Sequence, residues 1–318
     1  MSTKIEWTDI TWNPSTGCDR ISPGCDNCYA MTMAKRLKAM GAEKYQNDGD
    51  PRTSGPGFGV TFHPEVALEP LRWRKPRKVF VDSMSDLAHA RVADEEIALA
   101  FAVMALAPQH QFQLLTKRPK RLAKLLARND FRKMMADVAP LIEDGNGGDS
   151  ADDWLRVNAP WPLPNVWIGV SAEDQTRAHL RIPWLLDTPA AVRFVSAEPL
   201  LGPLDLRMWL EDDPAKFDVP PLDWVIVGGE SGPKARPMHP DWARDIRDQC
   251  TGAGVAYLFK QWGDYVTTDQ MPEDTFRDWD ALHNASTCRP GMFWRVGKKH
   301  AGRELDGRTW DEYPEVSA

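Results

Sequence analysis

In the stretch Val79-Phe80-Val81-Asp82-Ser83, a short continuous apolar run ends in polar residues. Apolar runs of this kind, without alternation, are typical of strands buried on both faces, as in parallel sheets. A stretch rich in Ala, Leu and Met follows at residues 95–107 and indicates a helix. The same order recurs downstream, with strands expected at 111–116, 165–171, 192–196, 224–228 and 255–259, and helices at 120–135, 175–187 and 241–252.

With one more strand expected near residues 5–11, about seven strands alternate with helices along the chain. This order predicts an α/β fold, a complete or partial (β/α) barrel of the TIM type. Residues 41–64 and 144–164 interrupt the order because they are rich in Gly, Pro and Asp, and we expect insertions there. We therefore expect a barrel over residues 1–265, which carries both insertions, and a C-terminal cap over residues 266–318.

The composition is that of a globular protein with a large core. The chain has 318 residues, of which 42% are hydrophobic and 14 are Trp. It contains no apolar run of membrane-spanning length and no signal-peptide pattern, so we expect no membrane association and a cytoplasmic location.

The charge distribution bears on nucleic-acid binding. The net charge of −7 argues against a protein that coats nucleic acid non-specifically. Basic residues nevertheless gather at residues 72–78 and 117–121, which could follow a phosphate backbone or simply form a solvated edge. The candidates for weak nucleic-acid contacts are Arg72, Arg74, Lys75 and Arg118.

Three of the five cysteines, Cys18, Cys25 and Cys28, lie close together in the pattern C-x6-C-x2-C. An odd number of cysteines in a long chain without a signal sequence argues against a disulfide framework. A structural zinc site usually takes four ligands from two C-x2-C knuckles, and this loop has only one. An iron–sulfur cluster held by three thiolates, with the fourth iron open to a small molecule, fits the pattern better. Zinc and metal-free thiols stay open as alternatives.

Polar residues follow the carboxyl ends of the expected strands, which form the ligand-binding edge in parallel α/β folds. Ser, Asp and Gly at these places also serve as helix caps, but six such endings in succession favour an active site. Three of the endings carry a glutamate, which could act as an acid, as a base or as an acceptor for a ribose hydroxyl, or serve as a structural salt-bridge partner. The endings are residues 82–86, 116–118, 171–174, 196–199, 228–232 and 260–263, and the glutamates are Glu173, Glu198 and Glu230.

A series of motifs resembles a widespread phage-borne family of radical-SAM-like proteins of uncertain function, which have three cysteines in the pattern C-x6-C-x2-C. The resemblance covers about residues 4 to 265, and a more distant similarity runs to spore photoproduct lyase, which also places Thr-Lys after a barrel strand. If a phage encodes the protein, its location is the host cytoplasm. The motifs lie at residues 4–8, 11–14, 17–30, 82–87, 114–119, 167–171 and 228–232.

The resemblance implies a partial (β/α) barrel of the radical-SAM type. Cys18, Cys25 and Cys28 would bind a [4Fe-4S] cluster, and S-adenosyl-L-methionine would chelate its fourth iron. An external flavodoxin or ferredoxin would supply the electron that generates a 5′-deoxyadenosyl radical. The implied contacts to S-adenosyl-L-methionine are Tyr29 at the adenine, Ser83, Ser85 and Asp86 at the amino group, Lys117 at the carboxylate, and Ser171 or Glu173 at the ribose.

The sequence departs from that superfamily in two ways. The usual spacing is C-x3-C-x2-C, so three extra residues must bulge out between Cys18 and Cys25. The Gly-Gly-Glu motif, which usually ends the second barrel strand, comes several strands later at residues 228–230, so Glu230 is not assigned to the cofactor.

The expected substrate is a nucleobase or nucleotide, which the enzyme would modify or rearrange, with a hypermodified pyrimidine in phage DNA as one candidate. Two other functions stay open. One is a zinc-binding, non-catalytic nucleic-acid-binding protein, and the other is a radical-SAM enzyme that acts on a small metabolite.

Overall fold

The structure is a computed structural model that describes residues 3, 5–142, 151–211, 220–275 and 291–315. The chain divides into two compact units, which are described separately. Unit 1 comprises Met1–Ser22, Cys28–Val170 and Pro183–Arg193, and unit 2 comprises Pro23–Asn27, Ser171–Ile182 and Phe194–Ala318.

A seven-stranded sheet has the strand order β1-β4-β5-β6-β7-β8-β9. The strand pairs within each unit are parallel, and helices separate the strands along the chain. This mixed α/β order is that of a partial (β/α) barrel, so the expected fold class is confirmed at that level. The strands are β1 (Ile10–Trp12), β4 (Lys78–Val81), β5 (Gln111–Thr116), β6 (Val166–Ser171), β7 (Val192–Ala197), β8 (Trp224–Gly228) and β9 (Ala256–Gln261).

The core of unit 1 lies between its strands and α3 (Asp94–Leu106), which is apolar on nearly all sides and buried from Ile97 to Ala105. A helix that is apolar all round is a core helix, because it has no polar face to turn toward solvent. The single helix expected at 120–135 is two helices, α4 (Pro119–Leu126) and α5 (Phe131–Asp137). Asn129 and Asp130 lie between them, and both residue types disfavour helix interiors.

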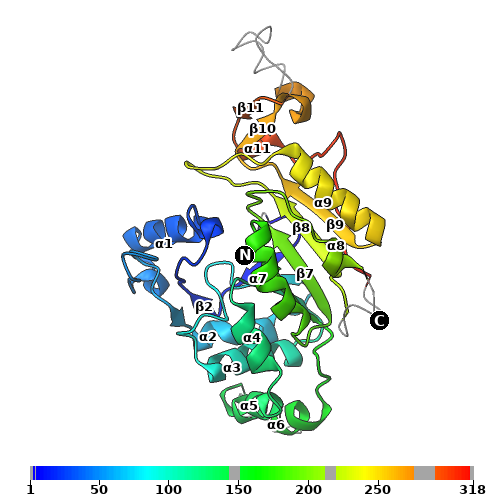
Figure 1. Ribbon diagram of the computed structural model, residues 1–318. Coiled ribbons are helices and arrows are strands. Elements are labelled where there is room, and N and C mark those ends of the chain that lie inside the picture. The colour runs from blue at the N-terminus through cyan, green and yellow to red at the C-terminus, as the bar shows by residue number, and fades with distance from the viewer. Residues whose placement is uncertain (1–2, 4, 143–150, 212–219, 276–290, 316–318) are drawn as a thin grey trace. The chain divides into compact units, whose positions relative to one another are not determined.

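In unit 2, α9 (Pro240–Ala253) packs along β9 and contacts α8 (Arg207–Leu210) (Figure 1). α9 ends at Gly254, which adopts the left-handed conformation with φ 69° that a C-terminal glycine allows. An antiparallel pair, β10 (Tyr265–Thr267) with β11 (Phe293–Arg295), follows, and then α11 (Lys298–Ala301). Residues 276–290 of the expected cap lie outside the described residues.

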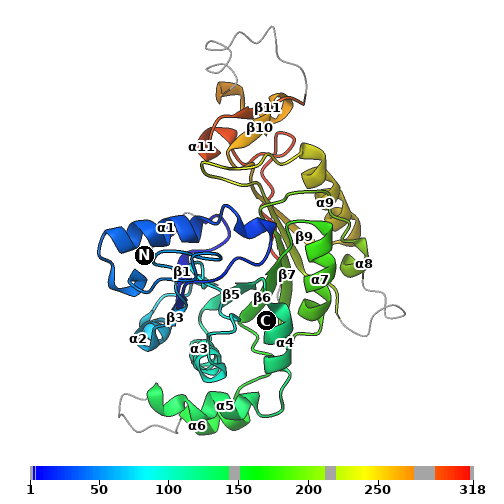
Figure 2. The same ribbon diagram turned by 60° about the vertical axis from the view of Figure 1, so that its left-hand side comes forward.

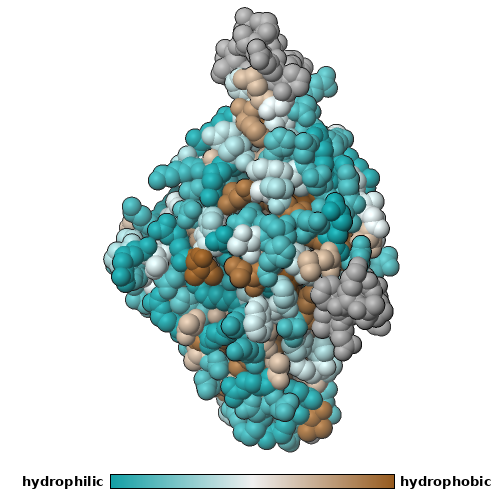
Figure 3. All heavy atoms as spheres, viewed as in Figure 1, coloured by the Kyte–Doolittle hydropathy of each residue, from teal (hydrophilic) through white to brown (hydrophobic). Residues whose placement is uncertain are grey.

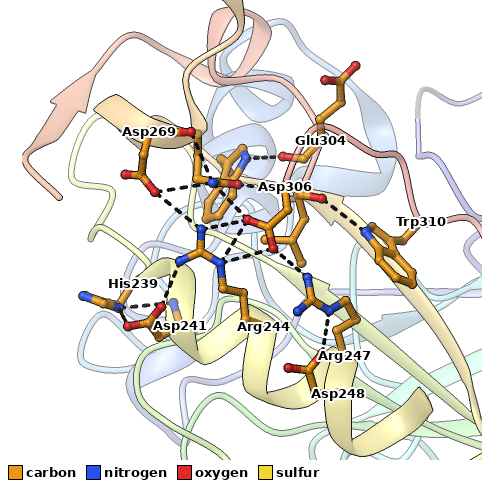
Figure 4. A network of polar contacts seen from close by, with 12 residues as sticks. His239, Asp241, Arg244, Arg247, Asp248, Asp269, Glu304, Asp306 and Trp310 are labelled. Atoms are coloured by element: carbon orange, nitrogen blue, oxygen red, sulfur yellow. Dashed lines mark hydrogen bonds and ion pairs between the residues drawn. The ribbon is translucent and has the colours of Figure 1, made fainter. Parts of the chain in front are cut away.

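The C-terminal segment is tied to α9 through Asp306 (Figure 4). Asp306 accepts hydrogen bonds from Arg244 and Arg247 of α9, the shortest at 2.7 and 2.6 Å. These hydrogen bonds, the one from Arg244 first, lower the pKa of Asp306 to about 2. Arg244 also reaches Asp241 and Asp269, so one guanidinium joins three segments of unit 2.

The expected insertions differ in structure. Residues 41–64 return to the N-terminal region, where β3 (Thr61–Phe62) pairs antiparallel with β2 (Ser15–Thr16). Of residues 144–164, the part up to 150 lies outside the described residues, and α6 (Ala151–Asp153) and η5 (Trp154–Asn158) follow it. Figure 2 shows α5 and α6 beside each other at one end of unit 1. The remaining helices among the described residues are η1 (Pro23–Cys25), α1 (Tyr29–Ala39), η2 (Glu43–Tyr45), α2 (Pro64–Ala67), η3 (Glu69–Arg72), η4 (Ala139–Leu141), α7 (Gln175–Leu186) and η6 (Thr268–Gln270).

The face shown in Figure 3 is largely hydrophilic, and hydrophobic residues occur on it singly or in small groups. Over the described part of the chain, no helix is both long enough and apolar enough to span a membrane.

Candidate functional site

The cysteine loop leaves unit 1 beside the carboxyl end of β4. Gly17 forms a parallel bridge with Ser85 and donates its N–H to the carbonyl of Met84 at 3.0 Å. Gly17 has φ +86°, and a Cβ there would lie 2.2 Å from the carbonyl oxygen of Gly59. Only glycine fits this place, so residues 41–64 hold the first residue of the loop tightly against β4.

Arg118 lies against the first cysteine. It follows β5, and its Nη1 lies 3.2 Å from Cys18 Sγ and 2.8 Å from a carboxylate oxygen of Asp86. Its Nη2 donates to the carbonyl of Asp19 at 2.9 Å. Burial would lower the pKa of Arg118, but the charges of Asp86 and Cys18 outweigh burial and raise it. A fixed positive N–H donor beside sulfur suits a thiolate that ligates metal.

Asp86 joins the ends of β4 and β5. It is buried, and its carboxylate accepts hydrogen bonds from Thr116 Oγ1 at 2.6 Å, from the backbone N–H groups of Lys117 and Ala88 at 3.1 Å, and from Arg118. All of these donors belong to unit 1. The carboxylate therefore orients Arg118 toward Cys18.

Asp19, next to Cys18, is held by a second polar cluster. Its carboxylate contacts His89 at 3.1 Å and Arg91, and it accepts from Thr53 at 2.7 Å and Ser54 at 3.1 Å. Burial would raise its pKa, but the hydrogen bond from Thr53 and the hydrogen bond and charge of Arg91 outweigh burial and hold the pKa well below its usual range. Burial, together with the charge of Arg118, lowers the pKa of His89.

The third cysteine begins α1. Cys28 precedes Tyr29, the first residue of the helix, and both Cys18 and Cys28 pack against a small apolar cluster that includes Met84 and Phe58. Tyr29 is exposed, and its hydroxyl donates to the carbonyl of Ser83. Unit 1 thus brings two of the cysteines to one cluster beside the end of β4.

Ser83 and Ser85 take part in hydrogen bonds within the same strand end. Ser83 Oγ donates to the side chain of Asn13 at 3.0 Å. Ser85 Oγ lies 2.7 Å from Ser15 Oγ, which in turn donates to the buried carboxyl of Asp82 at 2.7 Å.

In unit 2, the segment that carries Cys25 meets the end of β6. Glu173 is fully buried, and its Oε1 accepts the backbone N–H of Gly24 at 3.1 Å. Its Oε2 pairs with Arg181 at 2.8 Å, and Arg181 also donates to the carbonyl of Ser171 at 2.8 Å. A Cβ at Gly24 would lie 3.0 Å from the Glu173 carboxyl carbon, so the contact is close.

The same segment meets Glu230, the residue that follows β8 and Gly229. Asn27 donates its amide to Glu230 Oε2 at 3.0 Å, and Arg236 donates to both carboxylate oxygens, the shorter contact at 2.6 Å. Arg236 also donates to the carbonyl of Pro23 at 2.9 Å. Burial would raise the pKa of Glu230, but the hydrogen bonds from Arg236 and Asn27 outweigh burial and lower it.

The two glycines of the Gly-Gly-Glu motif allow close packing. A Cβ at Gly229 would lie 1.8 Å from the carbonyl oxygen of Trp262, and one at Gly228 would lie 3.0 Å from the carboxyl carbon of Glu198. Glu198 binds Lys260 through both carboxylate oxygens at 2.8 Å. The strand ends of unit 2 therefore hold carboxylates that are each paired with a basic side chain.

The residues expected from the sequence fall into groups. Unit 1 brings Cys18 and Arg118 together with Asp86, and Tyr29 together with Ser83; unit 2 holds Cys25 near Glu173. Lys117 reaches Asp86 through its backbone N–H. Among the candidate phosphate contacts, the guanidinium of Arg118 is largely buried, whereas Arg72, Arg74 and Lys75 are exposed.

Sequence reasoning missed the partners of these groups. They are Asp19, Asn27, Arg91, Arg181 and Arg236. Asp19 and Asn27 stand beside the cysteines in the sequence, and Arg236 follows the Gly-Gly-Glu motif by six residues, which are the only signals the sequence offers.

The donor set fits an iron–sulfur cluster by its chemistry. Cys18, Cys25 and Cys28 are half-buried thiols outside any disulfide. Within the described ranges, no three His, Cys, Asp or Glu side chains are grouped so as to hold one metal ion. Thiolates on a cluster bind separate irons and need not meet at one ion, and the N–H donor at Cys18 is of the kind that tunes such a cluster.

Comparison with known proteins identifies a family. No curated protein and no solved structure matches the chain. A family model described as "Protein of unknown function (DUF5131)" matches residues 2–314, so the chain belongs to the DUF5131 family.

Proposed function

We propose that the protein is a radical-SAM enzyme that binds a [4Fe-4S] cluster through Cys18, Cys25 and Cys28 and acts on a nucleobase or nucleotide. The observation that carries this proposal is the setting of the first cysteine. Cys18 lies beside the ends of two parallel strands, half-buried, with the guanidinium of Arg118 on its sulfur. Parallel strands in α/β folds bind their ligands at this edge.

The chain's own residues would hold the cofactor and shape its surroundings. When bound, the cluster and S-adenosyl-L-methionine together supply a 5′-deoxyadenosyl radical, which removes a hydrogen atom from the substrate. Arg118, held by Asp86, would keep a donor on Cys18. Tyr29, Ser83 and Ser85 lie near the same strand end and would contribute contacts to S-adenosyl-L-methionine.

The exposed basic residues support a substrate with phosphate groups. Arg72 and Arg74 are exposed, as is Lys75, and a short stretch with this much positive charge attracts a polyanion despite the negative net charge. An external flavodoxin or ferredoxin would supply the electron. The proposed substrate is therefore a base within DNA or a nucleotide.

The test measures formation of 5′-deoxyadenosine. The protein is reconstituted anaerobically with iron and sulfide, reduced with dithionite, and given S-adenosyl-L-methionine with single-stranded DNA, with nucleotides, or alone. We expect product from the wild type and only background from Cys25→Ala, while Cys250→Ala, the matched cysteine buried in α9, keeps the activity. Equal product from Cys25→Ala and the wild type would overturn the proposal, and stimulation by neither DNA nor nucleotides would remove the substrate class.

A further inference from the structure

The segment Pro23–Asn27, which carries Cys25, is held by hydrogen bonds on both sides of that cysteine within unit 2. On the Gly24 side it donates a backbone N–H to Glu173. On the Asn27 side it donates a side-chain amide to Glu230 at 3.0 Å. The two contacts come from the ends of different strands, β6 and β8, so each holds the segment independently.

Each glutamate is fixed by its own arginine and has capacity left for the segment. Glu173 binds Arg181 through one oxygen and Gly24 through the other. Glu230 binds Arg236 through both oxygens and shares one of them with Asn27. Buried carboxylates must be satisfied by donors, and both of these are buried, so the segment supplies part of an obligatory set.

Arg236 also contacts the segment directly. Its Nη2 donates to the carbonyl of Pro23 at 2.9 Å while the same guanidinium binds Glu230. Asp26 lies 3.7 Å from Arg236 Nη1 and adds an attractive charge. One side chain therefore reaches the segment both before and after Cys25.

We propose that Glu173 and the Glu230–Arg236 pair are positioning residues that fix the Cys25 thiol as the middle ligand of the cysteine loop. The Gly-Gly-Glu motif then serves the loop rather than a small-molecule cofactor. The six-residue spacing between Cys18 and Cys25 gives the loop more freedom than a shorter one has. The contacts with Glu173, Glu230 and Arg236 restrict residues 23–27 within unit 2. The identity of Cys25 as a ligand rests on the proposed function, but the fixing of residues 23–27 does not.

The first test uses the protein without metal. Amide hydrogen exchange of the peptide that contains residues 23–27 is compared among the wild type, Arg236→Ala, Asn27→Ala and the control Arg207→Ala. Arg207 is an exposed arginine of unit 2 that is paired with Asp205 at 3.0 Å, so the control removes the same kind of side chain elsewhere. Loss of hydrogen bonds to a buried charge should speed exchange in this peptide about tenfold or more.

Two further comparisons distinguish local loosening of residues 23–27 from general destabilisation of unit 2. Asn27→Ala leaves Glu230 with its arginine, so it should loosen the peptide while peptides from β8 and β9 exchange as in the wild type. Arg236→Lys keeps a positive charge at Glu230 and should restore part of the protection. Exchange of residues 23–27 within twofold of the wild type in both Asn27→Ala and Arg236→Ala would overturn the proposal.

The second test asks whether the contacts that hold residues 23–27 are needed for Cys25 to bind the cluster. The same variants are reconstituted anaerobically with ferrous iron and sulfide, and iron per chain and the EPR spectrum of the reduced protein are recorded. We expect Arg236→Ala to bind less iron and to give an altered spectrum, and Arg207→Ala to match the wild type. A wild type without a cluster would refute the proposed function and leave the exchange result standing. A full cluster with an unchanged spectrum in Arg236→Ala would overturn the positioning role alone.

Discussion

Asp82 should make the stability of unit 1 depend on pH. Its carboxyl is buried at the end of β4, where it accepts the backbone N–H of Ser15 at 3.1 Å and the Ser15 hydroxyl at 2.7 Å. Burial raises its pKa from 3.8 to about 7 against the opposing effect of these hydrogen bonds. Between these two values the folded protein keeps a proton that the unfolded chain has lost, so stability falls as pH rises. The slope is about 1.4 kcal/mol per pH unit, or about 4 kcal/mol over the window.

The variant Asp82→Asn removes this dependence. Asn keeps the shape of a protonated carboxyl and tolerates the left-handed backbone at this position, where φ is 60°. The free energy of unfolding is measured by urea unfolding of the metal-free, reduced protein, followed by Trp fluorescence, from about pH 4 to about pH 8. As pH rises, this free energy should increase in the variant relative to the wild type by up to about 4 kcal/mol.

A matched control is Asp306→Asn, because Asp306 is the other non-glycine residue with positive φ among those described. Its pKa is lowered to about 2 by its arginine partners, so its contribution is lost only as pH falls below about 4. The free energy of unfolding of this variant should therefore change with pH in parallel with that of the wild type between about pH 4 and about pH 7. Parallel curves for Asp82→Asn and the wild type would refute the reasoning about burial.

Three further predictions concern other contacts. Arg118→Ala strips a buried carboxylate of its charged partner and should cost about 3 kcal/mol in urea unfolding, whereas a loss below about 0.5 kcal/mol would contradict the buried pair. Gly229→Ala forces a Cβ against the carbonyl oxygen of Trp262 and should lower the free energy of unfolding by about 3 kcal/mol. Gly252→Ala, which lies in open space within α9, should raise it by about 0.5 to 1 kcal/mol, and equal effects of the two variants would exclude the close approach at Gly229. Arg244→Ala breaks the contact with Asp306 shown in Figure 4 and should speed limited proteolysis of the C-terminal segment severalfold, and an unchanged cleavage rate would show that other contacts hold the segment.

Much of the fold follows from local pattern. The strands β5, β6, β7 and β8 begin and end within one residue of the expected ranges. Continuous apolar runs mark β6 and β8 clearly, and β5 and β7 are still dominated by apolar residues although they contain Gln113 and Arg193. The first strand was placed less well. β1 covers only Ile10–Trp12, since the backbone N–H of Thr8 turns back to the carbonyl of Ile5 before the strand begins.

The site was predictable only in part. The sequence indicated the three cysteines and the strand ends, because both are local signals. It could not indicate that Glu173 binds Gly24, 149 residues away, or that Glu230 binds Asn27, 203 residues away. Such contacts depend on which strand ends the topology brings to the cysteine segment. Arg118 shows the same limit, because its place in a basic run suggested a phosphate contact and its surroundings are Cys18 and Asp86.

The most direct measurement of the central claim is the EPR spectrum of the anaerobically reconstituted, reduced protein with and without S-adenosyl-L-methionine. We expect a reduced [4Fe-4S] signal that shifts when S-adenosyl-L-methionine is added and is lost in Cys25→Ala but kept in Cys250→Ala. A colourless protein that carries stoichiometric zinc, or a cluster signal indifferent to S-adenosyl-L-methionine, would contradict the central claim.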